Sequence, residues 1–250
     1  MSNVISFINF KGGTGKTTSV INLGAFLAMQ GYKTLLVDLD PQSNLSEGLG
    51  VYDTEHTIYT AFQNKRKPVV TTIGENLSLI PSNLDCVGFD FDLGRQDYKE
   101  RILQNMLKDT LPQYDFVLLD LPPTLNSVVL NALVISDYVV VPLEAEFFAY
   151  RGLDRIIDII KKVKENSSPN IQLLGVLVTH YLPNRNLSDS ITQAVKDHFD
   201  NRVFETKIRK TIKLSEAQAE GKSIFEYDVT CNGAIDYAEL GKELLEKLNK

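Results

Sequence analysis

The sequence Lys11-Gly12-Gly13-Thr14-Gly15-Lys16-Thr17-Thr18 lies between the apolar run Val4–Ile8 and the segment Thr17–Gln30, whose apolar residues repeat at helical spacing. A glycine-rich loop that ends in Gly-Lys-Thr between a strand and a helix is typical of a phosphate-binding loop. Its glycines let successive N–H groups face an anion, and the helix N-terminus adds partial positive charge. We expect Lys16 to reach the terminal phosphates and the Thr17 hydroxyl to bind Mg²⁺. The alternative, a glycine-rich turn that only starts a helix, leaves the Gly-Lys-Thr sequence unexplained.

The rest of the chain alternates between strand-like and helix-like segments. Short apolar runs of the kind found in strands buried on both faces occur at Val4–Ile8, Thr34–Asp38, Leu77–Ile80, Phe116–Asp120, Tyr138–Pro142 and Leu173–Thr179. The segment Thr17–Gln30 carries one apolar stripe, made of Val20, Leu23, Gly24 and Leu27. The alternation predicts an α/β fold, with a doubly wound, mostly parallel sheet and helices on both faces. We expect one domain over residues 1–250, without an N-terminal helix-turn-helix, because the first strand begins near residue 4.

Composition narrows the class of protein. Hydrophobic residues make up 43% and charged residues 23%, so a disordered or fibrous chain is excluded. The net charge of −6 disfavours a protein coated in nucleic acid but leaves room for a local basic patch. Cys86 and Cys231 lack the spacing of metal ligands and are too few for a disulfide framework, which favours thiols in a reducing compartment. Without a signal sequence or a membrane-spanning run, we expect a cytoplasmic protein.

Acidic residues stand at the ends of two predicted strands. Asp38 and Asp40 end or follow one strand, and Asp120 ends another. In α/β sheets, ligands bind at the carboxyl edge, where these side chains would meet the phosphate loop. Asp120 is therefore expected to hold Mg²⁺, directly or through water. The alternative for each aspartate is a turn residue or a helix N-cap.

The loop also carries a second lysine, Lys11, at its start, and in this it resembles the deviant Walker A motif of the ParA/MinD family. Further segments resemble the family's motifs: Asp38–Gln42, Tyr114–Pro123, Leu130–Leu133, Glu144–Leu153, Lys213–Ala217 and Gly221–Ile224. The resemblance, which is to ParA/Soj-type partition ATPases, implies ATP and Mg²⁺ as cofactors. It implies that Lys11 contacts the nucleotide of the partner subunit in a dimer, that Asp40 orients the attacking water, and that Asp38 supports the metal site.

Two departures from the family pattern affect the residues expected near the adenine base of the nucleotide. Phe10 stands where glutamine is common, and Ile208-Arg209-Lys210 replaces the usual Ile-Pro-Arg-Asn. We expect Asn9, Thr179 and the segment 208–210, including Ile208 and Arg209, to lie near the base. The choice of ATP over GTP is implied by the family alone.

The resemblance implies a specific cycle. ATP drives a homodimer, the dimer binds DNA nonspecifically on the nucleoid, and a ParB-like centromere-binding partner stimulates hydrolysis. The span Arg202–Lys213 holds five cations against one acid, which favours a phosphate-facing patch. The expected DNA contacts are Arg185, Arg209, Lys210 and Lys213. A solvated charged loop is the alternative, and the cargo, whether plasmid, chromosome or protein assembly, stays open.

Two other functions fit a P-loop. A MinD-like membrane switch needs a C-terminal amphipathic helix with a basic polar face. The tail Asp236–Lys250 instead mixes three glutamates with three lysines around its leucines, which predicts a helix docked on its own domain. An enzyme of metabolism or electron transfer of the nitrogenase-reductase kind needs cluster-ligating cysteines at strand ends, and Cys86 and Cys231 do not lie at such positions.

Overall fold

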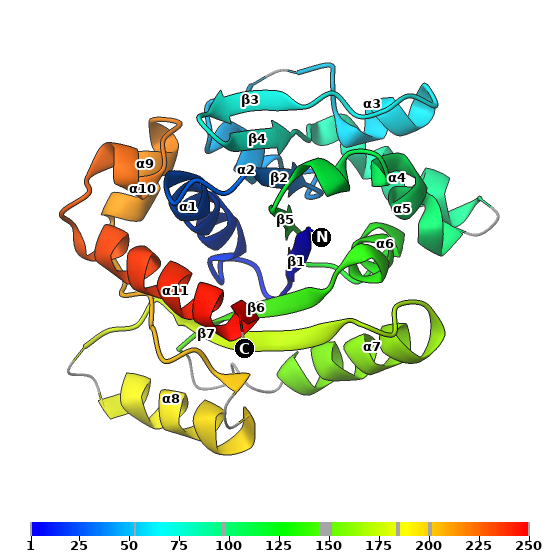
Figure 1. The fold of residues 1–250 in the computed structure, drawn as a ribbon. Coiled ribbons are helices and arrows are strands. Elements are labelled where there is room, and N and C mark those ends of the chain that lie inside the picture. Colours follow the sequence, from blue (N-terminus) through cyan, green and yellow to red (C-terminus); the bar gives the residue numbers. More distant parts are fainter. Residues whose placement is uncertain are drawn as a thin grey trace.

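In the computed structural model, which describes residues 2–52, 54–96, 99–145, 152–183, 186–199 and 202–249, seven strands form one sheet (Figure 1). The strands are β1 (Asn3–Phe7), β2 (Thr34–Asp38), β3 (Thr71–Gly74), β4 (Leu77–Ile80), β5 (Phe116–Asp120), β6 (Tyr138–Glu144) and β7 (Gln172–Thr179). Their order is β3-β4-β2-β5-β1-β6-β7, and every neighbouring pair is parallel except β3 and β4. The predicted mostly parallel sheet is confirmed.

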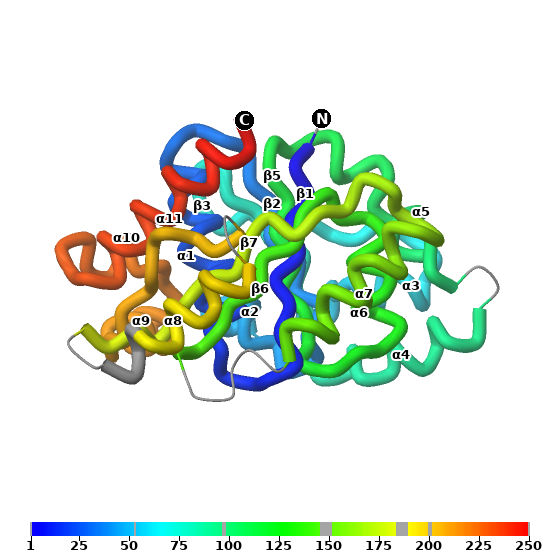
Figure 2. The backbone as a smooth tube through the Cα atoms, turned by 90° about the horizontal axis from the view of Figure 1, so that it is seen from below, coloured from blue at the N-terminus to red at the C-terminus, as the bar shows by residue number. Residues whose placement is uncertain are grey.

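Helices cover both faces of this sheet. One face carries α1 (Lys16–Met29), α9 (Lys213–Ala219), α10 (Ile224–Tyr227) and α11 (Asn232–Asn249), and the other carries α4 (Val87–Gly94), α5 (Ile102–Leu107), α6 (Ser127–Ile135) and α7 (Leu153–Asn166) (Figures 1 and 2). The remaining α-helices are α2 (Asn44–Glu47), α3 (Ile58–Gln63) and α8 (Asn186–Phe199). Short 3₁₀ turns span Leu84–Cys86, Lys99–Arg101 and Leu111–Gln113.

The apolar strands are explained by two cores, one on each face. Side chains alternate along a strand, so Val4 of β1 enters the core beneath α4–α7 while Ile5 enters the core beneath α1 and α9–α11. Strand β2 divides in the same way, with Leu35 on the first side and Leu36 on the second. A strand buried on both faces needs apolar residues at consecutive positions, as its sequence shows.

Helix α1 differs from the prediction of a single apolar stripe. Its residues from Ser19 to Ala28 are all buried, because the sheet covers one side and α11 covers another. Gly24 and Gly241 allow these close approaches: a Cβ at Gly24 would come within 2.6 Å of Leu36, and a Cβ at Gly241 within 2.1 Å of Phe26. The predicted docking of the C-terminal helix on its own domain is confirmed.

The parallel strands bring their carboxyl ends to one edge of the sheet. The loops that follow β1, β2, β5, β6 and β7 therefore gather there, although the chain between the first and the last exceeds 160 residues. Figure 2 shows β1 in the middle of the sheet, with β5 and β6 beside it. This edge holds the candidate functional site. In the part of the chain that the structure describes, no helix is both long and apolar enough to cross a bilayer.

Candidate nucleotide-binding site

The glycine-rich loop adopts the backbone that its sequence predicts. Gly13 (φ 74°) and Gly15 (φ 83°) lie in the left-handed region, which glycine enters without steric cost. Helix α1 begins at Lys16, directly after Gly15, and no side chain caps its N-terminus. Its first N–H groups are therefore left to bind an anion, with the helix dipole in support.

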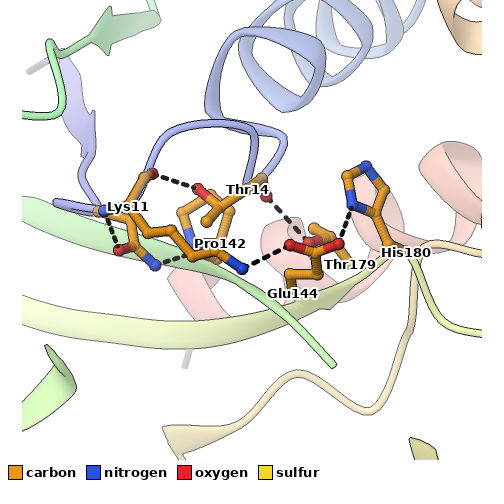
Figure 3. A network of polar contacts seen from close by, with 7 residues as sticks. Lys11, Thr14, Pro142, Glu144, Thr179 and His180 are labelled. Atoms are coloured by element: carbon orange, nitrogen blue, oxygen red, sulfur yellow. Dashed lines mark hydrogen bonds and ion pairs between the residues drawn. The ribbon is translucent and has the colours of Figure 1, made fainter. Parts of the chain in front are cut away.

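Neighbouring strands hold this loop in place (Figure 3). The Asn9 amide donates to the Pro142 carbonyl (2.8 Å), and its oxygen accepts from the backbone N–H of Lys11 (3.0 Å). At the other side, the Thr179 hydroxyl donates to the Thr14 carbonyl (2.9 Å). The loop is thus fixed to β6 and β7 before any ligand binds, which lowers the conformational cost of binding.

Lys16 lies inside the loop, with 7% of its surface exposed. Its Nζ donates to the Asn9 carbonyl (3.3 Å). Burial lowers its pKa, and the nearby charges of Asp120 and Asp40 oppose that shift. A terminal phosphate would supply the negative charge that this buried ammonium lacks.

Asp120 and Thr17 meet beside the loop. The Thr17 hydroxyl donates to Asp120 Oδ2 (2.6 Å), whereas the buried Asp120 Oδ1 has no hydrogen-bond partner among the described residues. Burial, followed by the charge of Asp38 on the adjacent strand, raises the pKa of Asp120 to about 8. A carboxylate with an unused oxygen, next to a hydroxyl, is the hard-oxygen environment that Mg²⁺ prefers. The residues present therefore fit the predicted metal.

Asp38 and Asp40 have different surroundings. Asp38 is fully buried and accepts from the Ser46 N–H (2.9 Å), the Ser46 hydroxyl (2.7 Å) and the Asp40 N–H (3.1 Å). Burial raises its pKa to about 7. Asp40 instead lines the pocket and accepts from the Gln42 N–H (2.9 Å). Asp38 thus fixes the loop that carries Asp40, and the Asp40 side chain lines the pocket.

A pocket of about 540 Å³ opens over these groups. Beyond residues 12–18 and Asp40, its walls include Gln42, Asn44, Glu47, Gly48, Tyr52, Pro123, His180, Gln218 and Ala219. Sequence reasoning missed these wall residues. His180 directly follows Thr179 at the end of β7, so its position after a predicted strand was a usable signal, whereas no local pattern marks Tyr52 or Gln218.

Two glycines join the walls of this pocket. Gly50 (φ 76°), after α2, and Gly221 (φ 68°), after α9, pack backbone to backbone, and a Cβ at Gly221 would come within 2.9 Å of the Gly50 Cα. Glu47 and Gly48 lie just before the first glycine, and Gln218 and Ala219 just before the second. The spacing of the two walls therefore depends on this close contact.

The expected base-side residues are not confirmed by their positions. Ile208 is 2% exposed in the core, and neither it nor Arg209 lines the pocket. Asn9 uses both ends of its amide to hold the loop, as described above.

The basic residues expected to contact DNA separate into three groups. Arg209 forms a bidentate ion pair with the buried Asp236 of α11, so its guanidinium is engaged within the subunit, and its contact with DNA stays a prediction. Lys210 is exposed, and Lys213 makes an ion pair with Glu216 (3.2 Å) that is partly open to solvent. Arg185 lies outside the described residues.

The fold and the loop geometry define a P-loop ATPase. Residues 2–173 match the family model described as "AAA domain". The chain is 38% identical to the chromosome-partitioning ATPase Soj of Treponema pallidum, over 99% of this chain and 98% of the relative. It belongs to the ParA/Soj-type family of partition ATPases, as its sequence motifs predicted.

Solved structures agree with this placement. The fold is similar to that of cobyrinic acid a,c-diamide synthase from Mycobacterium smegmatis with bound ADP and magnesium (TM-score 0.87, 30% identity, 100% of this chain and 96% of the other). It is also similar to the septum site-determining protein MinD from Pyrococcus horikoshii complexed with Mg-ADP (TM-score 0.82, 26% identity, 100% and 98%). The predicted cofactors, an adenine nucleotide and Mg²⁺, are the ligands of these relatives.

Proposed function

We propose that this chain, acting as one domain in the cytoplasm, is a Mg-ATP-dependent dimerising ATPase that binds DNA nonspecifically and drives DNA partition with a ParB-like partner. Lys11 is the observation that carries the proposal. It starts the phosphate loop, and its side chain is 50% exposed at the open edge of the site, where a second subunit could approach. In this proposal Lys16 serves the nucleotide of its own subunit from inside the loop, and Lys11 serves the nucleotide of a neighbouring subunit.

The chemistry follows from the positions of the chain's own groups. The loop N–H groups and Lys16 bind the phosphates, Thr17 and Asp120 would hold Mg²⁺, and Asp40 orients the attacking water. The bound metal supplies positive charge to the transferring phosphoryl group. Asp38 keeps Asp40 in position through the contacts at Ser46 and at the Asp40 backbone. Positioning and charge stabilisation account for most of the catalysis in phosphoryl transfer.

Dimerisation and DNA binding are tested with one variant. Asp40→Ala should keep Mg-ATP and accumulate as a dimer, since it lacks only the group that orients water. Light scattering coupled to size-exclusion chromatography, in Mg-ATP and in Mg-ADP, gives the oligomeric state, and the same samples are titrated with random-sequence duplex. A variant that binds ATP but stays monomeric contradicts the proposed dimer. A dimer that has no affinity for random-sequence duplex DNA at low salt contradicts the proposed nonspecific binding to DNA.

The MinD-like membrane function has less support. A membrane-binding helix would need a free apolar face, but Leu240 and Leu244 of α11 are buried in the core beside α1. Leu245 and Leu248 also pack against that core. We therefore propose that the dimer binds DNA and not a membrane.

A further inference from the structure

Glu144 ends β6 beside the phosphate loop and uses both carboxylate oxygens (Figure 3). Oε2 accepts from Lys11 Nζ (2.9 Å), and Oε1 lies 3.2 Å from His180 Nδ1. Burial alone would raise the pKa of Glu144, but the hydrogen bonds from Lys11 and His180 outweigh it, so the pKa lies below its ordinary value. The carboxylate is therefore ionised at neutral pH and attracts the Lys11 ammonium.

The backbone of Lys11 cannot shift freely, because its N–H is bonded to the Asn9 side chain. Only its side chain can reorient. In the proposed role, the same ammonium turns toward the phosphates of a nucleotide in another subunit. Glu144 and that nucleotide therefore compete for the charge of Lys11.

We propose that Glu144 is a positioning residue that holds Lys11 within its own subunit and releases it when the ATP-bound dimer forms. This inference rests on the proposed function, in which Lys11 acts across the dimer. Each subunit then breaks one ion pair on dimerisation. Because this Lys11–Glu144 ion pair must break, it restrains dimerisation and raises the protein concentration at which dimers form.

His180 makes that release reversible. After Lys11 leaves Oε2, the carboxylate keeps its contact at Oε1, and 20% of its side chain is open to water. It is therefore not left as an unpaired buried charge, which would be far more costly. Because the pair is partly exposed, we expect its loss to shift the equilibrium roughly two- to five-fold for each subunit, and therefore roughly four- to 25-fold in the dimer dissociation constant, because two pairs break per dimer.

The test compares Glu144→Gln with Glu47→Gln. Glu47 lines the pocket over the phosphate loop, and its carboxylate accepts from the Ser43 hydroxyl, so this control removes one negative charge near the site without changing the Lys11 contact with Glu144. Dimer dissociation constants are measured in Mg-ATP by sedimentation, with both variants in the Asp40→Ala background. We expect Glu144→Gln to dimerise roughly four- to 25-fold more tightly than Glu47→Gln, because the variant removes the pair from both subunits.

A second readout does not depend on dimerisation. In the nucleotide-free monomer, Lys11 should be acetylated by acetic anhydride roughly two- to five-fold faster in Glu144→Gln than in the control, because a contacting carboxylate favours the charged, unreactive amine. Mass spectrometry of the Lys11 peptide measures this rate. Equal rates in the two variants overturn the restraint. Faster acetylation in a protein that never dimerises with Mg-ATP supports the restraint and overturns the proposed function instead.

Discussion

Asp120 gives the stability of the nucleotide-free protein a characteristic dependence on pH. Its folded-state pKa of about 8 lies above the ordinary value of 3.8, so the folded protein retains a proton that the unfolded chain has lost. The contribution of this group to stability is full below pH ~4 and is lost as pH rises through ~8. Each pH unit in between lowers the free energy of unfolding by at most about 1.4 kcal/mol.

Asp120→Asn mimics the protonated carboxyl and removes this dependence. Between pH 5 and pH 8.5 the melting temperature of nucleotide-free wild type should fall by roughly 8–16 °C relative to that of the variant, because about three pH units at about 1.4 kcal/mol each correspond to about 4 kcal/mol, at roughly 2–4 °C per kcal/mol. Differential scanning calorimetry at both pH values measures the difference. The variant should also lose Mg²⁺-dependent hydrolysis. A constant difference between the two proteins at all pH values would refute the raised pKa.

The two lysines of the loop should separate into two functions. Lys16→Ala removes the buried charge on the phosphates and should lower affinity for Mg-ATP at least about a hundred-fold, as expected when a charged group loses its buried partner. Lys11→Ala should bind Mg-ATP close to wild type and stay monomeric. Equilibrium dialysis and light scattering measure the two properties. Wild-type affinity in Lys16→Ala would mean that the loop does not bind phosphate as described.

For single residues, the sequence predicted the parts of the site that depend on neighbours along the chain. The spacing from Lys11 to Thr18 predicted the loop, and the strand-end positions of Asp40 and Asp120 predicted their common edge. The pairing of Lys11 with Glu144 was not predictable, because it joins residues 133 positions apart through the register of β1 with β6. The pairing of Arg209 with Asp236 was not predictable for the same reason, since Asp236 lies on a helix that packs against Arg209 only in the fold.

At the scale of elements, the glycine contact between the α2 and α9 turns should control the shape of the pocket. Gly221→Ala would place a Cβ against Gly50, whereas Gly31→Ala, also at a positive φ (86°), meets nothing within 4 Å. Both variants place alanine at a positive φ, so the difference between their stabilities measures the contact of residue 221 with Gly50. Gly221→Ala should lose about 1–3 kcal/mol more in urea unfolding and bind ATP more weakly. Equal losses would show that the two turns separate without cost.

The sequence predicted the buried strands of the sheet but missed the edge strand β3. Six apolar runs gave β1, β2, β4, β5, β6 and β7, because burial on both faces demands continuous hydrophobicity. Strand β3 was missed, since Thr71–Gly74 is short, alternates between partly buried and exposed residues, and pairs only with β4. Its strand state is set by that partner more than by its own composition.

At the scale of the whole molecule, the net charge of −6 must be overcome locally for DNA to bind. Lys210→Glu and Lys213→Glu should each weaken binding of the Mg-ATP dimer to random duplex while leaving dimerisation intact. Each lost contact occurs twice in a dimer, so the slope of log affinity against log salt should become shallower by about 1.8. Lys242→Glu, an exposed site on α11, is the control. Fluorescence anisotropy at several salt concentrations measures the slopes, and equal slopes in all three variants would place the DNA surface elsewhere.

The central position of β1 in the sheet also bears on how the chain is made. β1 needs β5 and β6 on its two sides, and Asn3 pairs with Phe116, 113 residues further along. At roughly 5–20 residues per second, the ribosome takes on the order of 10 s to supply that partner. During synthesis both edges of β1, whose residues Val4 to Phe7 are all buried in the folded protein, stay unpaired next to a phosphate loop that has not yet been anchored. Nascent chains of this protein should therefore depend on chaperones that bind β1. Slower translation of the segment between β1 and β5 should increase aggregation, even though the final fold is unchanged.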